Sequence, residues 1–132
     1  MSRQKYKVAL ADDNPLIRRG LTELINSFEE YEILFDAANG QELIERVGGG
    51  AVPDCIILDI NMPRKDGYET ALWLRANYPT VRVIALSMIE EEAAVSRMLQ
   101  NGARAYLIKD TEPWKLKETL DTILAGGIDP HR

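Results

Sequence analysis

The chain has 132 residues, 45% of them hydrophobic, and a net charge of −5 at pH 7. This length predicts one domain with a buried core, and the acidic balance argues against binding of nucleic acid or an anionic membrane by this domain. A single cysteine, Cys55, excludes an internal disulfide and a cysteine zinc site. Neither a signal-peptide core nor a membrane-length apolar stretch is visible, so a cytoplasmic location is expected.

Apolar runs, caps and glycines divide the chain into ten elements. In chain order, they are predicted as a strand at 6–11, a helix at 15–28, a strand at 31–37, a helix at 40–47, a strand at 54–60, a helix at 67–77, a strand at 81–87, a helix at 90–101, a strand at 103–109 and a helix at 112–125. Strict alternation of strands and helices predicts an α/β fold, with a parallel sheet covered by helices on both faces.

Local signals place several of the helix ends. Asn14-Pro15 combines an N-cap residue with proline at the first helical position. Asn39 and Glu42 have the spacing of a capping box for the next helix. Gly102 follows the fourth helix and is well suited to its C-terminal end.

Polar residues stand at the ends of four predicted strands. Asp12 and Asp13 follow the first strand, and Asp59 ends the apolar run of the third. Ser87 ends the fourth strand and Lys109 ends the fifth. Because the carboxyl ends of strands in a doubly wound sheet border one crevice, these side chains are expected to form one site.

The three carboxylates of this site predict a Mg²⁺ ion. Carboxylates held close together resist joint ionisation, and a divalent cation relieves the repulsion. We expect Asp13 and Asp59 to contact the metal together with the carbonyl of Asn61, with Asp12 nearby or bound through water. Lys109 adds a cation that can pair with a carboxylate or with a phosphoryl oxygen.

The chain resembles the receiver domain of two-component response regulators over almost its whole length. The residues that carry the resemblance are Asp12-Asp13, Asp59, Met62-Pro63, Asp66-Gly67, Ser87, Tyr106 and Lys109. The resemblance implies a flavodoxin-like (βα)5 fold with strand order 2-1-3-4-5. Residues 1–127 would form the receiver domain, and residues 128–132 a tail or a truncated linker.

The resemblance also implies the function, a signalling switch in which a sensor histidine kinase phosphorylates Asp59 with the help of Mg²⁺. It also implies that Asp12 and Asp13 are the metal-site acids and that Lys109 balances the charge of the phosphoryl group. Ser87 would hydrogen-bond to the phosphoryl group, and Tyr106 would be an aromatic switch that turns inward. The one histidine, His131, is in the predicted tail, so the phosphoryl group is expected to come from another molecule.

One departure from the family pattern concerns the residue after the lysine. Many members have proline there, after a cis peptide bond, whereas Asp110 follows Lys109 here. A cis bond before a non-proline residue costs about 2.5–4 kcal/mol, so the geometry at this bond stays open.

The residues before Lys109 resemble the subgroup with a C-terminal helix-turn-helix output domain of the LuxR/NarL type. This similarity implies transcription regulation through a missing DNA-binding domain or a separate effector, with a phosphorylation-dependent homodimer as a further possibility. The predicted partner face consists of Val95, Met98, Leu99, Lys115 and Lys117. Trp73 and Trp114 are expected to pack against the domain.

Three other functions compete with the switch. A Mg²⁺-dependent phosphatase that forms an aspartyl-phosphate typically needs an acid two residues after the nucleophile, where this chain has Asn61. A flavin-binding module would need glycine and hydroxyls in the first loop, which here begins with Asp12-Asp13. A receiver-like module that binds partners without phosphorylation fits poorly with the complete set of acids.

Overall fold

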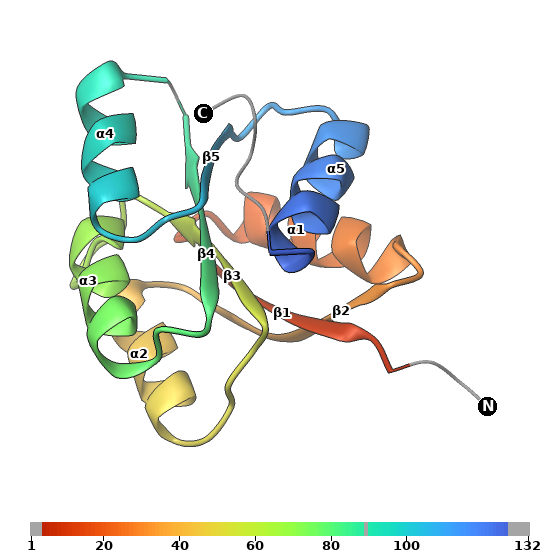
Figure 1. Ribbon diagram of the computed structural model, residues 1–132, viewed down its shortest axis with the longest axis horizontal. Helices are drawn as coiled ribbons and strands as arrows, with labels where there is room; N and C mark the ends of the chain where they lie inside the picture. The colour runs from red at the N-terminus through yellow and green to blue at the C-terminus, as the bar shows by residue number, and fades with distance from the viewer. Residues whose placement is uncertain (1–3, 89, 127–132) are drawn as a thin grey trace.

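The computed structural model describes residues 4–88 and 90–126, so the expected tail at 128–132 lies outside the described residues. The elements in chain order are β1 (Tyr6–Ala11), α1 (Pro15–Ser27), β2 (Tyr31–Ala37), α2 (Gly40–Gly48), β3 (Cys55–Asp59), α3 (Gly67–Asn77), β4 (Arg82–Ser87), α4 (Glu92–Gln100), β5 (Ala105–Ile108) and α5 (Pro113–Leu124) (Figure 1). The five strands form a parallel sheet in the order β2-β1-β3-β4-β5. The predicted fold class and strand order are confirmed.

Helices cover both faces of the sheet, with α1 and α5 on one face and α2, α3 and α4 on the other (Figure 1). Neighbouring residues of a strand point to opposite faces, so each strand contributes to two apolar clusters. Val8 and Leu10 of β1 pack in the cluster under α1 and α5, whereas Ala9 and Ala11 belong to the cluster under the other three helices. All four of these residues are fully buried.

The element bounds agree with the sequence prediction to within one residue at each end, except for two elements. Strand β5 is shorter than the predicted 103–109, and helix α4 begins two residues later than the predicted 90–101. The N-cap residue of α4, Glu91, makes no capping hydrogen bond through its side chain. An N-cap without such a bond leaves the first helical N–H groups unsatisfied and marks the boundary weakly.

The capping box predicted at Asn39 is only half formed. Asn39 accepts from the N–H of Glu42 at 2.8 Å, as expected, but the carboxylate of Glu42 accepts from the N–H of Ala38 instead of that of Asn39. A complete capping box occurs at the start of α3, where Asp66 and Glu69 each accept from the other's N–H. This capping box fixes the start of α3, directly after the loop that follows β3.

The predicted partner face is wrong for two of its residues. Val95 and Met98 are 5% and 0% exposed and pack in the core, because the apolar stripe of α4 faces the sheet and not the solvent. Leu99 is half-buried against the same cluster. The packing expected for Trp114 is also wrong, since 65% of that residue is exposed.

The part of the chain that the structure describes contains no helix with both the length and the apolar character needed to span a bilayer.

Candidate functional site

The strand order brings the predicted site residues to one edge of the sheet. Asp12 follows β1, Asp59 ends β3, Ser87 ends β4 and Lys109 follows β5, and these four strands are neighbours in the sheet. The carboxyl ends of parallel strands lie at the same edge. Asp12, Asp59 and Ser87 are buried there, whereas Asp13 is exposed to solvent.

The ammonium group of Lys109 bridges the two buried acids. Its Nζ lies 3.0 Å from Oδ2 of Asp12 and 3.1 Å from Oδ2 of Asp59. The other carboxylate oxygens accept from backbone N–H groups, Oδ1 of Asp12 from Asn14 at 2.8 Å and Oδ1 of Asp59 from Asn61 at 3.2 Å. Each acid is therefore held by a loop N–H on one side and by the shared ammonium on the other.

Burial and mutual repulsion change the proton affinities of these groups. Burial and the charge of Asp12 raise the pKa of Asp59 to about 6, although Lys109 opposes the rise. Burial by itself would lower the pKa of Lys109, but Asp12 and Asp59 outweigh it and hold that pKa above its usual value. One ammonium thus serves two buried carboxylates, and the site retains an excess of negative charge.

The chemistry of the donors fits a magnesium ion. Carboxylate oxygens of Asp12, Asp13 and Asp59 lie within 4.8 Å of one another. The Oδ2 atoms of Asp12 and Asp59 are buried, and apart from their ion pairs with Lys109 they have no hydrogen-bond donor among the described residues. Hard oxygen ligands next to solvent are the setting in which Mg²⁺ binds while keeping several of its waters.

A hollow opens from solvent onto the carboxylate of Asp59. Sequence reasoning missed its apolar rim, which includes Ile17 and Met88, because an apolar side chain beside a site looks like a core residue in the sequence. Met88 is 65% exposed. The hollow is lined by Asp13, Asn14, Pro15, Ile17, Asp59, Asn61, Met88 and Lys109.

The two predicted switch residues lie on neighbouring strands, β4 and β5. Ser87 is buried at the end of β4, and its carbonyl accepts from the N–H of Lys109 at 2.8 Å. Tyr106 is 4% exposed and its ring packs in the apolar cluster under α2, α3 and α4. The ring is therefore already inward in this structure. The described residues include no cis peptide bond, so the bond between Lys109 and Asp110 is trans.

Two glycines that the site requires were not singled out from the sequence for this role. The N–H of Gly67 donates to the carbonyl of Ile60 at 2.8 Å, and a Cβ at Gly67 would lie 2.6 Å from the carbonyl oxygen of Asp59. Gly40 donates to the carbonyl of Lys65 at 3.1 Å, and a Cβ there would lie 2.4 Å from that oxygen. Gly40 and Lys65 lie far apart in the sequence, and Gly67 meets Ile60 across the turn between β3 and α3, so neither contact follows a helix or strand periodicity.

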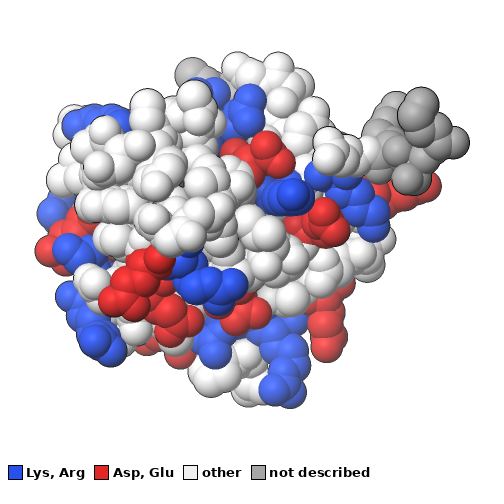
Figure 2. Space-filling model, turned by 90° about the horizontal axis from the view of Figure 1, so that it is seen from below, with Lys and Arg blue, Asp and Glu red and all other residues white. Residues whose placement is uncertain are grey.

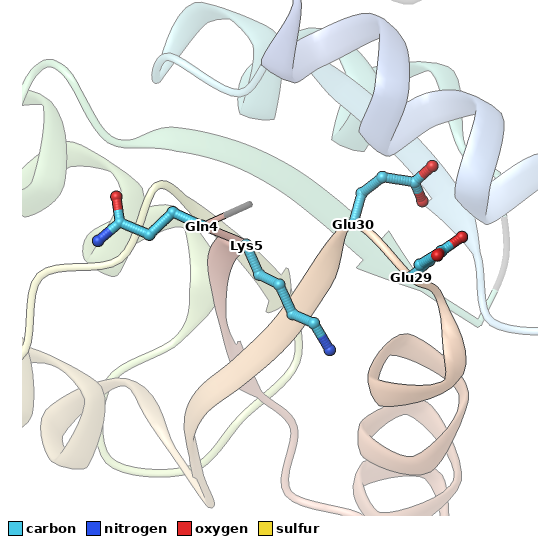
Figure 3. Close-up of a pocket in the computed structure, with 4 residues that line it drawn as sticks. All are labelled: Gln4, Lys5, Glu29 and Glu30. Atoms are coloured by element: carbon cyan, nitrogen blue, oxygen red, sulfur yellow. The ribbon is translucent and has the colours of Figure 1, made fainter. Parts of the chain in front are cut away.

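Two other parts of the described surface differ from this site. Acidic and basic side chains are interspersed on the face shown in Figure 2, so that face presents no field of a single sign. A second hollow lies at the opposite, amino end of the sheet and is lined by Gln4, Lys5, Glu29 and Glu30. In Figure 3 the two glutamates point the same way, whereas Gln4 and Lys5 point elsewhere, so the four side chains do not meet at one point.

Comparisons with known proteins agree with this geometry. The family description "response regulator receiver domain" matches residues 8–121. The chain is 37% identical to a nitrate/nitrite response regulator protein homolog of Haemophilus influenzae, over 94% of this chain and 59% of the relative. It is 32% identical to the transcriptional regulatory protein DegU of Brevibacillus brevis, over 99% of this chain and 55% of the relative. The chain thus spans somewhat more than half the length of these curated relatives.

Solved structures give the same result. The signal receiver domain of a response regulator NarL from Mycobacterium tuberculosis superposes with a TM-score of 0.88 at 28% identity, covering 94% of this chain and 99% of that one. A CheX–CheY–BeF3–Mg complex from Borrelia burgdorferi gives a TM-score of 0.83 at 26% identity, covering 91% and 90%. The chain belongs to the response regulator receiver domain family, and its homologues are NarL- and DegU-type response regulators.

Proposed function

We propose that Asp59 accepts a phosphoryl group from a sensor histidine kinase in a reaction that requires Mg²⁺. The observation that carries this proposal is the environment of the Asp59 carboxylate. It is buried, lies 3.1 Å from the ammonium of Lys109, and borders a hollow that opens to solvent. A nucleophile held in this way needs positioning and charge neutralisation more than acid–base help.

In the proposed transfer, an oxygen of Asp59 attacks the phosphorus of the donor's phosphohistidine. A bond forms between this oxygen and phosphorus, and the phosphorus–nitrogen bond breaks, with its electron pair returning to the imidazole. Lys109 favours the ionised form of Asp59 before the attack and offsets the charge of the phosphoryl oxygens afterwards. Mg²⁺, held by Asp12, Asp13, Asp59 and the carbonyl of Asn61, would supply further charge neutralisation.

The phosphoryl group changes the domain through its charge and its strong acceptor oxygens. The hydroxyl of Ser87 donates to one of these oxygens in the proposed active state, and the inward ring of Tyr106 fits that state. A change at Asp59 alters a distant partner only if the two states bind that partner with different affinities. We propose that a DNA-binding output domain or a separate effector is this partner, because several matched relatives, DegU of Brevibacillus brevis among them, are named transcriptional regulatory proteins.

Phosphorylation with a small donor tests the proposal directly. Wild-type protein incubated with acetyl phosphate and Mg²⁺ should gain one phosphoryl group by intact mass, and Asp59→Asn should gain none. Asp110→Asn is a matched control, because Asp110 is an exposed acid next to Lys109. Phosphorylation of Asp59→Asn at the wild-type rate would refute Asp59 as the acceptor.

The phosphatase alternative has less support. The residue two positions after Asp59 is Asn61, and its amide cannot act as the general acid that such enzymes use. Hydrolysis of a small phosphate ester with many turnovers, lost in Asp59→Asn, would restore that alternative.

A further inference from the structure

We infer that Arg18 is a positioning residue for the acidic loop, setting where Asp13 stands as a metal ligand. The inference rests on the proposed Mg²⁺ site and goes beyond it, because Arg18 is not one of the acids that would bind the ion. Its guanidinium joins the loop after β1 to the end of β2.

Arg18 reaches back from the first turn of α1. Its own N–H donates to the carbonyl of Asn14 at 2.9 Å, as the helix requires. Its Nη1 donates to the carbonyl oxygen of Asp12 at 2.7 Å, and its Nε pairs with Oδ1 of Asp36 at 3.2 Å. The side chain of Arg18 is 22% exposed, so this double contact is partly shielded from water.

These contacts complete the set of partners around Asp12. Its N–H donates to the carbonyl of Ala37 at 3.1 Å, and its two carboxylate oxygens are held by Asn14 and Lys109. Arg18 is the side chain that holds the remaining group, the backbone carbonyl. Asp12 is thereby fixed at every polar atom.

The fixed carbonyl matters for the next residue. A peptide unit is planar, so holding the carbonyl of Asp12 also fixes the direction in which the chain enters Asp13. Asp13 is exposed, and its carboxylate must nevertheless stay within 4.8 Å of Asp12 and Asp59 to share a metal with them. Arg18 therefore sets the direction of the backbone at Asp13, the most exposed of the three acids.

A positioning role and a purely electrostatic role of Arg18 predict opposite effects on Mg²⁺ binding. A cation beside three acids weakens the attraction of a second cation, so a purely electrostatic Arg18 would oppose Mg²⁺ binding. A positioning Arg18 promotes it. The ion pair with Asp36 offsets part of the charge of Arg18, which favours the positioning role. Lysine keeps the charge but lacks the planar fork that binds in two directions.

The test compares Mg²⁺ affinity in Arg18→Lys, Arg18→Met and wild type by isothermal titration calorimetry at constant ionic strength. Arg19→Lys is the matched control, because Arg19 is the exposed neighbour on the same helix. We expect both Arg18 variants to bind Mg²⁺ about tenfold more weakly, within the range seen when partners of metal ligands are removed. Arg19→Lys should bind like wild type.

A second readout separates positioning from general loss of structure. In phosphorylation by acetyl phosphate, Arg18→Lys should raise the Mg²⁺ concentration that gives half the maximal rate about tenfold, while the rate at saturating Mg²⁺ stays near that of wild type. Urea unfolding without metal measures stability independently. If Arg18→Lys unfolds too readily to be studied, Arg18→Met carries the test, because the loss of positioning predicts weaker Mg²⁺ binding and the loss of charge predicts tighter binding.

Each outcome has one meaning. Wild-type Mg²⁺ affinity in Arg18→Lys, or tighter binding in Arg18→Met, overturns the positioning role and leaves the proposed function intact. Wild-type protein that binds no Mg²⁺ refutes the metal site itself, and with it the proposed function.

Discussion

The two ends of the sheet satisfy their polar groups in different ways. At the amino end, Tyr6 and Tyr31 stack at 5.9 Å, the hydroxyl of Tyr31 hydrogen-bonds to Asp121, and Asp54 accepts from the N–H of Lys7 at 2.8 Å. At the carboxyl end, two buried carboxylates share one ammonium. The amino end is arranged for stability, whereas the carboxyl end keeps a surplus of charge that a ligand must relieve.

This surplus has an energetic consequence that the amino end lacks. Asp12 and Asp59 are 0% and 1% exposed, and burying charges costs free energy unless their partners are sufficient. Such a site lowers the free energy of unfolding when no metal is bound, and binding of a cation to the folded state raises it again. The following predictions test that contrast, in order of decreasing effect.

Lys109→Met should have the largest effect, because it removes the ammonium between Asp12 and Asp59. Breaking a buried ion pair costs about 3–5 kcal/mol, and we expect a loss of that order in the free energy of unfolding at pH 7.5 without divalent metal. Urea denaturation measures it. Lys117→Met removes two solvent-exposed ion pairs and should lose far less stability, because exposed pairs contribute little. Equal losses of unfolding free energy in the two variants would contradict the difference between the buried site and the surface ion pairs.

Gly67→Ala should cost about 3 kcal/mol, toward the upper end of the range for overpacking. The added Cβ would stand 2.6 Å from the carbonyl oxygen of Asp59, and backbone cannot move as a side chain can. The same change at Gly20, inside α1 with open space around it, should stabilise the domain by about 0.5–1 kcal/mol. Thermal and urea unfolding of both variants check the two signs, and destabilisation by Gly20→Ala would be unexpected.

Asp59→Asn should stabilise the metal-free domain by about 1–3 kcal/mol at pH 7.5. The pKa of Asp59 is about 6 in the folded state, above its ordinary value of 3.8. The folded state therefore binds this proton more tightly than the unfolded state, so stability falls as the pH rises from about 4 to about 6 and stays at the lower level above pH 6. The advantage of Asp59→Asn should shrink as the pH falls from 6 toward 4. Urea midpoints measured across this range test the sign, and an advantage that grows at low pH would refute it.

Tyr31→Phe should have the smallest effect, a loss of about 1 kcal/mol for one hydrogen bond to Asp121. Burial and Asp121 raise the pKa of Tyr31 above its usual range, so the hydroxyl stays a donor at all ordinary pH values. Because the change lies at the amino end, Mg²⁺ affinity measured by calorimetry should match that of wild type. A tenfold weaker affinity would show that the two ends are coupled.

Features predicted correctly from the sequence depend on neighbouring residues. Asn14 caps α1 through the N–H groups of Leu16 and Ile17, and both residues are within three positions of the cap. The positions of Asp59 and Lys109 at the strand ends follow from apolar runs and the rules of parallel sheets. Their placement beside Asp12 was therefore predictable without knowledge of any distance.

Predictions failed where the outcome depends on distant segments. Val95 and Met98 form an apolar stripe that, from the sequence, could face either a partner or the sheet. In the structure this stripe packs against the domain's own core, on the side of the sheet. The contacts of Gly40 with Lys65 and of Arg18 with Asp36 give no local signal, because folding brings these residues together from distant parts of the chain.

The sequence by itself determined the order of elements, the α/β class and the chemical types at the strand ends, because these depend on periodicity and on local caps. The tertiary structure decided that one ammonium serves two acids, that Tyr106 lies inward, and that Arg18 holds the carbonyl of Asp12. Those outcomes depend on ångström-scale distances between elements, and such distances arise only when the helices have packed on the sheet.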